Sequence, residues 1–327
     1  MKLQSGLIIL FDMQPKIRIV PILILLVTMV SGQSSGLVVL MNPVQSEQGQ
    51  DEEERWVRDY YHYRVSDIDQ LDVIVNYNLG ELNLEANHRK GMIDGSIRYY
   101  PSLTKPKIQY KTRGTTGILD ITAKANEDDS HLTVSWDELK SFKVNTEQLK
   151  NELDFALPSN IPTDLDLKFG LGEAQINLTD LQLLGLNLDC GLSDVQLQIN
   201  KPNDITSRYL EITNGLGSFK ATGLGYLRTR HVNLKVGLGS AELDFRGQIQ
   251  EDLEINIDVG LGSLELIFPK NVNVQANVKE NFLSGVNIND LVKSGTTWTT
   301  PDWDESRPTV TLDVNVGLGS IDIDLRK

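Results

Sequence analysis

Apolar and polar residues alternate over many short segments of this chain. In one of them, Ile255, Ile257 and Val259 alternate with polar side chains, and the alternation resumes at Leu264 after a short interruption. A period of two is typical of β-strands that bury one face. Equivalent pairs of runs occupy residues 165–178, 186–199, 232–245 and 312–325. We therefore predict an all-β protein in which each repeat has a first and a second arm, both pointing apolar side chains inward.

The two arms of each repeat are separated by Gly-Leu-Gly or a close variant. The inward residues flanking it, such as Val259 and Leu264, are five positions apart, whereas an uninterrupted strand requires an even number. We expect the chain to turn or bulge here, with positive φ at the glycines and the leucine inside the corner. The predicted corner residues are Asn78, Gly80, Gly170, Gly172, Gly191, Gly215, Gly217, Gly237, Gly239, Gly260, Gly262, Gly317 and Gly319.

The spacing of these motifs predicts a repeat architecture. From Gly170, the first glycines follow one another after 21, 24, 22 and 23 residues, and a gap of 57 residues precedes Gly317. Such periods are typical of stacked units that bury their apolar faces against their neighbours. We predict a right-handed, single-stranded or parallel β-solenoid resembling a β-helix, with Gly-Leu-Gly at equivalent corners. The long gap leaves room for one or two degenerate copies.

Four segments are expected along the chain. Residues 1–32 have the pattern of a signal peptide, with Met13 as an alternative start, and residues 33–54 form an acidic, flexible tether. Residues 55–160 form irregular rungs and a cap, and residues 161–327 the regular repeats. The apolar run of the first segment, residues 19–30, is shorter than the roughly 20 residues that span a bilayer. We expect an extracytoplasmic protein; the alternative is an anchor formed by residues 13–32.

Residues 55–160 have less regular signals. Strands are expected at 71–77, 82–86, 94–100, 107–112, 117–123 and 131–136, with turns at Gly91, Gly95, Gly114 and Gly117, and a short helix is expected at 145–157. The aromatic residues of this region are interpreted as a cap on the stack, with a sugar-stacking surface as the alternative. These residues are Trp56, Tyr60, Tyr61 and Tyr63.

Charge and motifs exclude several functions. The formal net charge is −14, which disfavours nucleic acid as a partner. Cys190 is the single cysteine and occupies an inward position, so we expect neither a disulfide nor a zinc site. None of the four histidines has a partner at catalytic or metal-ligand spacing, and no nucleophile elbow is present. We expect no enzyme activity, no cofactor and no metal; a polysaccharide-acting β-helix enzyme remains the alternative.

Two outward surfaces are candidates for partner binding. One is a ladder of polar residues at one position of successive second arms: Gln175, Gln196, Lys220, Glu242 and Glu265. The other is the loop 297–307, where Trp298 and Trp303 are interleaved with acidic residues. Exposed tryptophans are typical of binding surfaces. The alternative is that both tryptophans close the end of the stack.

The repeated Gly-Leu-Gly-Ser strands, the C-terminal run 312–323 and the preceding segment 298–308 resemble the toast-rack domain, and the stretch 71–84 resembles its N-terminal portion. The resemblance covers residues 67–327. It implies a β-solenoid of the bacterial cell envelope, similar to adhesin-like proteins and to the C-terminal domain of LiaF-like stress proteins. Two functions follow as expectations: an exported, non-enzymatic module that binds a protein or glycan of the envelope, or a membrane-tethered regulator. Contact with the membrane is expected only through a retained N-terminal segment.

Overall fold

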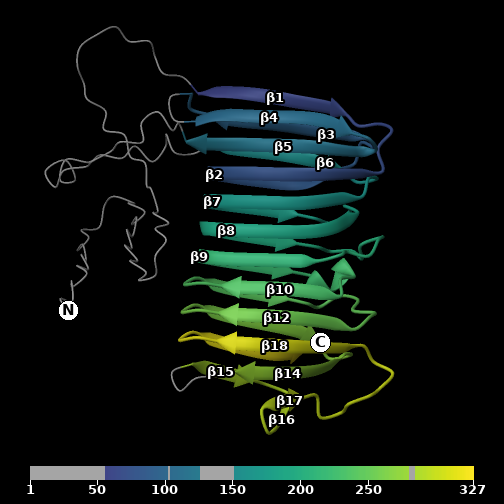
Figure 1. Ribbon diagram of the computed structural model, residues 1–327, viewed down its shortest axis with the longest axis vertical. Coiled ribbons are helices and arrows are strands. Elements are labelled where there is room, and N and C mark those ends of the chain that lie inside the picture. Colours follow the sequence, from purple (N-terminus) through teal and green to yellow (C-terminus); the bar gives the residue numbers. More distant parts are fainter. Residues whose placement is uncertain (1–55, 102–103, 126–150, 280–283) are drawn as a thin grey trace, which may run out of the picture. The chain divides into compact units, whose positions relative to one another are not determined.

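The computed structural model describes residues 56–101, 104–125, 151–279 and 284–327. Nineteen strands of this part pair into one open sheet, and the stacked strands are seen in Figure 1. No helix within these ranges is long and apolar enough to cross a membrane. The strands up to the 3₁₀ turn η3 (Leu224–Leu227) are β1 (Val57–Arg64), β2 (Gln70–Asn87), β3 (Met92–Tyr99), β4 (Thr104–Arg113), β5 (Thr116–Ala125), β6 (Glu152–Pro158), β7 (Thr163–Asn177), β8 (Leu183–Gln198) and β9 (Leu210–Thr222). The later strands are β10 (His231–Val236), β11 (Ser240–Asp244), β12 (Leu253–Val259), β13 (Ser263–Pro269), β14 (Asn273–Lys279), β15 (Gly285–Ile288), β16 (Val292–Ser294), β17 (Thr297–Thr299), β18 (Thr309–Val316) and β19 (Ser320–Arg326).

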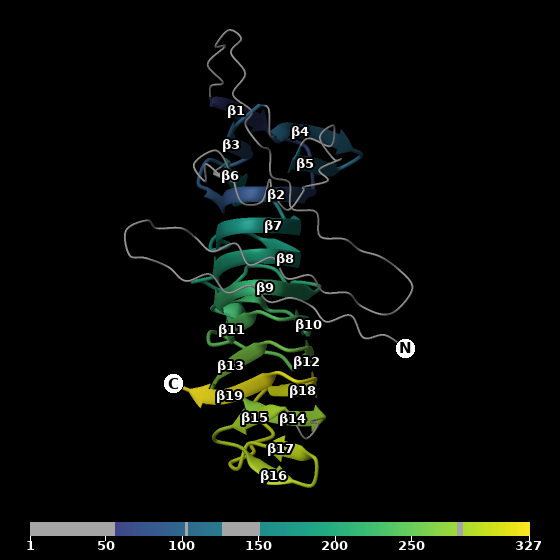
Figure 2. The ribbon, with the colours of Figure 1, turned by 90° about the vertical axis from the view of Figure 1, so that its left-hand side faces the viewer.

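Each regular rung has two arms, as the sequence predicts. Strands β7, β8 and β9 run through both arms, whereas β10/β11, β12/β13 and β18/β19 form the arms as separate strands. Every first arm pairs in parallel with the first arms beside it, and every second arm does the same. Figure 2 shows the two arms of these rungs side by side. The parallel stack is therefore held by repeated hydrogen bonding between equivalent positions.

The predicted inward register is confirmed by burial. Leu167, Ile257 and Ile323, for example, are at most 2% exposed, and their sequence neighbours are polar. Leu181, Leu224 and Leu227, from the connections between rungs, pack into the same core. Cys190 is also buried there, and burial raises the pKa of its thiol to about 12, so the thiol is protonated at neutral pH.

The Gly-Leu-Gly segments lie at one level of the stack. Leu79, Leu171, Leu192 and Leu216 pair in register, and the later copies continue the series, with Leu238 donating to Gly215 O and Leu261 to Gly237 O. The segments lie within continuous strands in β2, β7, β8 and β9 and form bends between strands at residues 237–239, 260–262 and 317–319. The rungs that contain β2, β7, β8, β9, β10, β12 and β18 therefore carry the tripeptide or its variant at the same level.

The expectation of positive φ throughout these glycines is wrong. Positive φ occurs at the second glycine of three copies: Gly80, Gly172 and Gly217. Gly237 and Gly260 have no positive φ; what excludes a side chain there is close approach, because a Cβ would lie 2.9 and 3.0 Å from the Gly215 and Gly237 carbonyl oxygens. A glycine is thus needed at the first position of the motif because the neighbouring rung lies close to it, and not because of its own φ angle.

The leucine of the motif does not fill the inside of the turn. The leucines at this position form a ladder on the surface, each between 36% and 55% exposed: Leu171, Leu192, Leu238, Leu261 and Leu318. The second position is buried in four copies, at Gly80, Ser193, Gly262 and Gly319, and half-buried in the other three, at Gly172, Gly217 and Gly239. The interior has room there only for backbone or a very small side chain.

The C-terminal rung lies inside the stack. First arm β18 pairs with β12 on one side and β14 on the other, and second arm β19 lies likewise between β13 and β15. Figure 1 shows β18 between β12 and β14. Strands β14 and β15 thus form a degenerate rung within the 57 residues that separate Gly260 from Gly317. The chain then returns, so that β18 and β19 lie between this rung and the rung of β12 and β13. The antiparallel strands β16 and β17 follow β14 at this end.

In the N-terminal part, too, the order of the strands in the stack differs from their order in the sequence. Strand β2 pairs with β7 on one side and with β5 and β6 on the other, although β3 to β6 follow it in the sequence. Pairing there is partly antiparallel, between β1 and β3, β3 and β6, and β4 and β5. The helix expected at 145–157 is wrong where it is described, because β6 occupies residues 152–158. Gly95 and Gly117 lie within β3 and β5, not in turns.

The remaining expectations for the N-terminal half fall partly outside the described residues. Strands are confirmed at 71–77, 82–86, 94–99, 107–112 and 117–123. The strand expected at 131–136, the signal peptide at 1–32 and the tether at 33–54 lie outside the described ranges. Those three expectations stay predictions.

Candidate functional site

One row of side chains crosses the outer face of the second arms. The predicted ladder from Gln175 to Glu265 is in register, each residue pairing with the next. The structure extends this row at both ends, and in stack order it contains Tyr60, Ser96, Asp154, Asn83, Gln175, Gln196, Lys220, Glu242, Glu265, Asp322 and Asn287. We call it the second-arm row. Neighbouring positions in it are separated by the distance between strands, about 4.8 Å.

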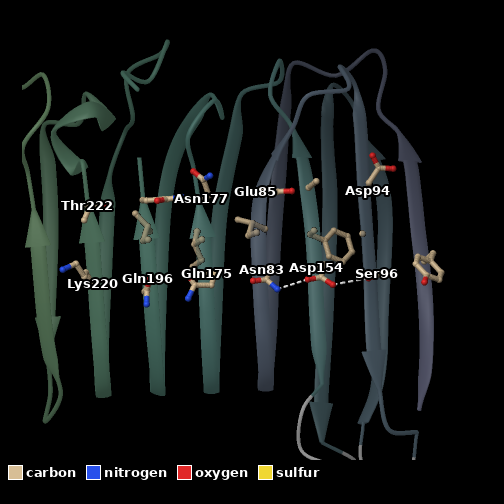
Figure 3. A pocket seen from close by; sticks show the side chains of 18 of the residues that line it. Asn83, Glu85, Asp94, Ser96, Asp154, Gln175, Asn177, Gln196, Lys220 and Thr222 are labelled. Atoms are coloured by element: carbon tan, nitrogen blue, oxygen red, sulfur yellow. Dashed lines mark hydrogen bonds between the residues drawn. The ribbon is translucent and has the colours of Figure 1, made fainter. Parts of the chain in front are cut away.

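Part of the second-arm row lies in a groove of about 870 Å³. The groove runs from Tyr60 on β1 across β3, β6, β2, β7 and β8 to Lys220 on β9. Figure 3 shows two lines of polar side chains in it, one containing Asn83, Gln175 and Gln196, the other containing Glu85 and Asn177. Ala156 lies between Glu85 and Asp94 in the second line, where its small side chain leaves space. Glu242 and Glu265 of the predicted ladder do not line this groove.

The charged groups at the two ends of the groove are paired within the protein. Near β1, Asp154 accepts hydrogen bonds from Asn83 Nδ2 at 2.8 Å and Ser96 Oγ at 3.4 Å, and Arg58 lies 3.6 Å from it. At the other end, Lys220 Nζ donates to both carboxylate oxygens of Glu242 at 2.8 and 2.9 Å. These pairs reduce the net charge that the ends offer to a ligand.

The part of the groove on β7 and β8 is uncharged and has unused hydrogen-bonding capacity, whereas Glu85 on the adjacent β2 is an exposed carboxylate without a partner among the described residues. Within the part of the chain that the structure describes, the side chains of Gln175, Gln196 and Gln198 make no hydrogen bond to the protein. Each amide has two donor hydrogens and one acceptor oxygen. Ile176 and Leu197, which line the groove, are at most 2% exposed. The groove therefore presents amides from β7 and β8 and few apolar contacts.

Asp94, which lines the groove, does not have the properties of a general acid. Burial alone would raise the pKa of Asp94, but hydrogen bonds from His62 and Asn87 and the charge of Arg89 outweigh it and lower that pKa. His62 Nδ1 lies 2.7 Å from Asp94 Oδ1. A general acid at neutral pH needs a raised pKa. Asp94 is held ionised, so it is unsuited to protonating a leaving group.

Within the part of the chain that the structure describes, the other histidines and the metal-ligating residue types give no alternative site. No group of three or more His, Cys, Asp or Glu able to hold a metal ion occurs in the described ranges. His231 lies 3.4 Å from Glu254 at an exposed position. His88 is exposed on the surface at the end of β2, and His131 lies outside the described residues.

The predicted aromatic cap is divided between two roles. Tyr61 packs on the core, with its ring 6.3 Å from that of Phe155, and Tyr63 packs 5.6 Å from Tyr110. Trp56 contacts Tyr100 edge-on and lies under Arg98. Tyr60, by contrast, is 68% exposed and lines the groove. Three of these aromatics therefore pack against the protein, and the fourth is free for a ligand.

The two tryptophans of the loop 297–307 also differ from each other. Trp298 lies on β17 opposite Ala276, packs against the core and has Lys293 Nζ 5.0 Å from its ring centre. Trp303 is 43% exposed. The burial of Trp298 supports the capping alternative for that residue, whereas Trp303 is available to a partner. Binding by either residue stays a prediction.

We predict that the two tryptophans respond differently to truncation. Trp298→Ala is expected to lower the free energy of unfolding by about 1–3 kcal/mol, because it removes a large, partly buried ring. Trp303→Ala is expected to change it by less than about 0.5 kcal/mol, as at other exposed positions. Urea denaturation of the two variants beside the wild type measures both values. Equal losses would contradict the assignment of the cap to Trp298.

The sequence pointed to only part of the groove. The third residue after the second position of the motif is predicted to lie in the row, and in successive copies it is Gln175, Gln196 and Lys220. The same count from Gly80 leads to Asn83. Asp154, Ser96 and Tyr60 come from strands without the motif, and no sequence signal places these strands beside β2. The aromatic-rich stretch 60–63 was the one signal for that end of the groove.

Two comparisons with known proteins, one with solved structures and one with protein families, found similarity. Solved structures with detectable similarity include a "putative cell adhesion protein" from Clostridium sporogenes (19% identity, TM-score 0.42, covering 83% of this chain and 100% of that one). A "putative adhesin" from Bacteroides fragilis (15%, TM-score 0.33, 82% and 97%) and a "Putative lipid binding protein" from Parabacteroides distasonis (12%, TM-score 0.30, 82% and 96%) are also similar. Among curated proteins, none matched. The family model described as the N-terminal domain of toast_rack, DUF2154, matches residues 45–222, and the chain therefore belongs to the toast-rack family.

Proposed function

We propose that this protein is an exported, non-enzymatic binding module of the cell envelope, and that the groove on the second-arm row holds its partner, a protein or a glycan. The observation that supports this most directly is the groove of about 870 Å³ with unpaired amides on β7 and β8. Ligand sites are typically concave and few per protein. The adhesin descriptions of the similar structures are consistent with a surface role, although their similarity extends to the fold alone.

The proposal includes an extracytoplasmic location and the geometry of the stack. Cleavage before Gln33 would release the mature chain, and retention of residues 13–32 would instead favour the membrane-tethered regulator. The path of the chain is proposed to be right-handed, the hand of nearly all parallel crossover connections, with the Gly-Leu-Gly segments as its corners. N-terminal sequencing of the protein from fractionated cells distinguishes the exported form from the anchored one.

Binding to the envelope is tested with a variant that fills the groove. The double variant Gln175→Arg/Gln196→Arg places two long side chains in the groove from exposed positions, so it is expected to keep the fold. The exported protein and this variant are incubated with washed envelope fragments of the producing organism, and the bound fraction is measured after sedimentation. We expect the variant to lose most of the bound fraction, because any ligand of the groove is displaced.

The matched control is Gln248→Arg, at an exposed glutamine that does not line the groove. It should bind like the wild type. Equal binding by the wild type and the groove variant would overturn the proposal that the groove is the contact surface.

A further inference from the structure

We propose that the ligand of the groove is an uncharged, extended polysaccharide whose chain runs across the strands, along the second-arm row. This inference rests on the proposed function, because it names the ligand class of the same groove. The features that support it are the periodicity of the row, the uncharged amides on β7 and β8 and the exposed ring of Tyr60.

The periodicity fits an extended sugar chain. The groove offers one side chain of the row per strand from Tyr60 to Lys220, at intervals of about 4.8 Å. An extended chain of 1,4-linked hexoses advances by a similar length per sugar, so successive sugars would meet equivalent polar groups. An extended peptide advances by about 3.3 Å per residue and does not keep step with the strands.

The chemistry of the centre fits hydroxyl groups. Gln175, Gln196 and Gln198 have amides without a protein partner among the described residues, and each can donate to one hydroxyl while accepting from another. Figure 3 shows the side chains of Gln175 and Gln196 at the same height on adjacent strands. A sugar hydroxyl, which both donates and accepts, can use both functions of an amide.

The charges argue against a charged polymer. The chain has a formal net charge of −14, and the lysine that lines the groove is paired with Glu242. A polyanion would therefore be repelled, and the groove would offer it only a cation that is already paired. At the opposite end, Asp154 is hydrogen-bonded by Asn83 and Ser96, and Asp94 is paired with Arg89, so a polycation would have to compete with those contacts. Glu85 is the one carboxylate lining the groove that has no partner among the described residues, and a single carboxylate does not match a repeating cationic chain.

A protein partner is less well matched to this surface. Protein interfaces depend on a few apolar or aromatic anchors seated in desolvated pockets. Here the lining Leu84, Ile176 and Leu197 are at most 2% exposed, so they offer no such pocket. Tyr60 is the exception, 68% exposed at the end of the row. Its flat ring suits the C–H face of a sugar, and its hydroxyl can take part in hydrogen bonding.

The test is isothermal titration calorimetry of the exported protein with hexasaccharides. The probes are cellohexaose and the hexamer of N-acetylglucosamine as neutral chains, oligogalacturonate as an anionic chain and a polyglutamine peptide as an amide-rich polypeptide. We expect a neutral hexasaccharide to bind and its dimer to bind far more weakly, because the dimer spans fewer strands. Gln175→Ala/Gln196→Ala should weaken binding by about tenfold or more, the effect of losing two ligand hydrogen bonds.

Conservative variants separate contact from stability. Tyr60→Phe should retain most of the affinity and Tyr60→Ala should lose most of it, and Gln248→Ala should bind like the wild type. All four variants are at exposed positions, and equal thermal midpoints show that they remain folded. Binding to the anionic chain or the peptide alone, or to no probe, would overturn the inference.

The outcomes also separate this inference from the proposed function. If the groove-filling variant loses envelope association while no neutral chain binds, the groove remains the contact surface and the ligand class is wrong. If envelope association is unaffected by filling the groove, the proposed function itself fails.

Discussion

Deletion of residues 309–327 is expected to disrupt the folding of every strand from β12 onward, and not the last rung alone. Strands β18 and β19 lie between β12/β13 and β14/β15, so their removal separates β14 and β15 from the rest of the stack. It also uncovers the apolar partners of Leu312, Val314 and Ile323, each at most 2% exposed. The exposed strand edges and apolar surface favour aggregation.

Limited proteolysis measures the extent of this loss. In the wild type, cleavage should be confined to connections, whereas the deletion variant should be cut throughout 253–299. A solenoid whose rungs followed one another in sequence order would lose only its end. Survival of a protected fragment containing 273–299 would therefore show that β18 and β19 do not hold the degenerate rung in place.

A substitution pair tests the same rung without removing it. Ile323→Asp places a charge at a position that is 0% exposed, and is expected to cost about 3–5 kcal/mol of unfolding free energy. Asp322→Ala, on the outward side of the same strand, removes a hydrogen bond from Asn287 and is expected to cost under about 1 kcal/mol. Similar losses in both variants would contradict the inward register.

The sequence predicts the register well because two independent signals coincide. Alternation defines which side chains face the core, and the recurring tripeptide aligns one rung with the next. The inward positions of Ile257 and Ile323 therefore follow from the residues alone. Side chains at one position of the motif, such as Gln175 and Gln196, are expected to form a row for the same reason.

The order of the rungs could not be predicted in this way. Equivalent arms such as β12, β14 and β18 present the same apolar alternation to a neighbour, so nothing in their residues specifies which two are adjacent. The return of β18 to a position between β12 and β14 depends on the long connection through β14 to β17. The same limitation applies to the groove, because Asp154 and Tyr60 come from strands that have no tripeptide.

The orientation of the tripeptide was predicted wrongly for a geometric reason. Inward residues that are five positions apart require a bend, but the count does not say which of the three residues faces inward. The largest apolar residue was assigned to the interior, whereas the structure buries the second glycine and exposes Leu261. A hydrophobic side chain in a bend can lie outside when the interior is filled by backbone from adjacent rungs.

This packing makes the second glycine the most sensitive position of the motif. Gly217 has φ of 125°, and an added Cβ would overlap the carbonyl oxygen of Ser193 on the next rung. Gly217→Ala is therefore expected to cost about 1–3 kcal/mol for the backbone conformation and a further ~1–3 kcal/mol for the overlap. Chemical denaturation of the purified variant gives the total.

Two control substitutions separate strain from overlap. Gly114, in the turn between β4 and β5, has φ of 60° and no atom within 4 Å of an added Cβ, so Gly114→Ala should show strain alone, about 1 kcal/mol. Gly237 has no positive φ, and its added Cβ would lie 2.9 Å from the Gly215 carbonyl oxygen, so Gly237→Ala should show overlap alone. If close stacking of the rungs excludes side chains at the level of the Gly-Leu-Gly segments, Gly217→Ala should lose more unfolding free energy than Gly114→Ala or Gly237→Ala. A loss at Gly217 no larger than at Gly114 would mean that the neighbouring rung yields to a side chain, and that the glycines are present for backbone angle only.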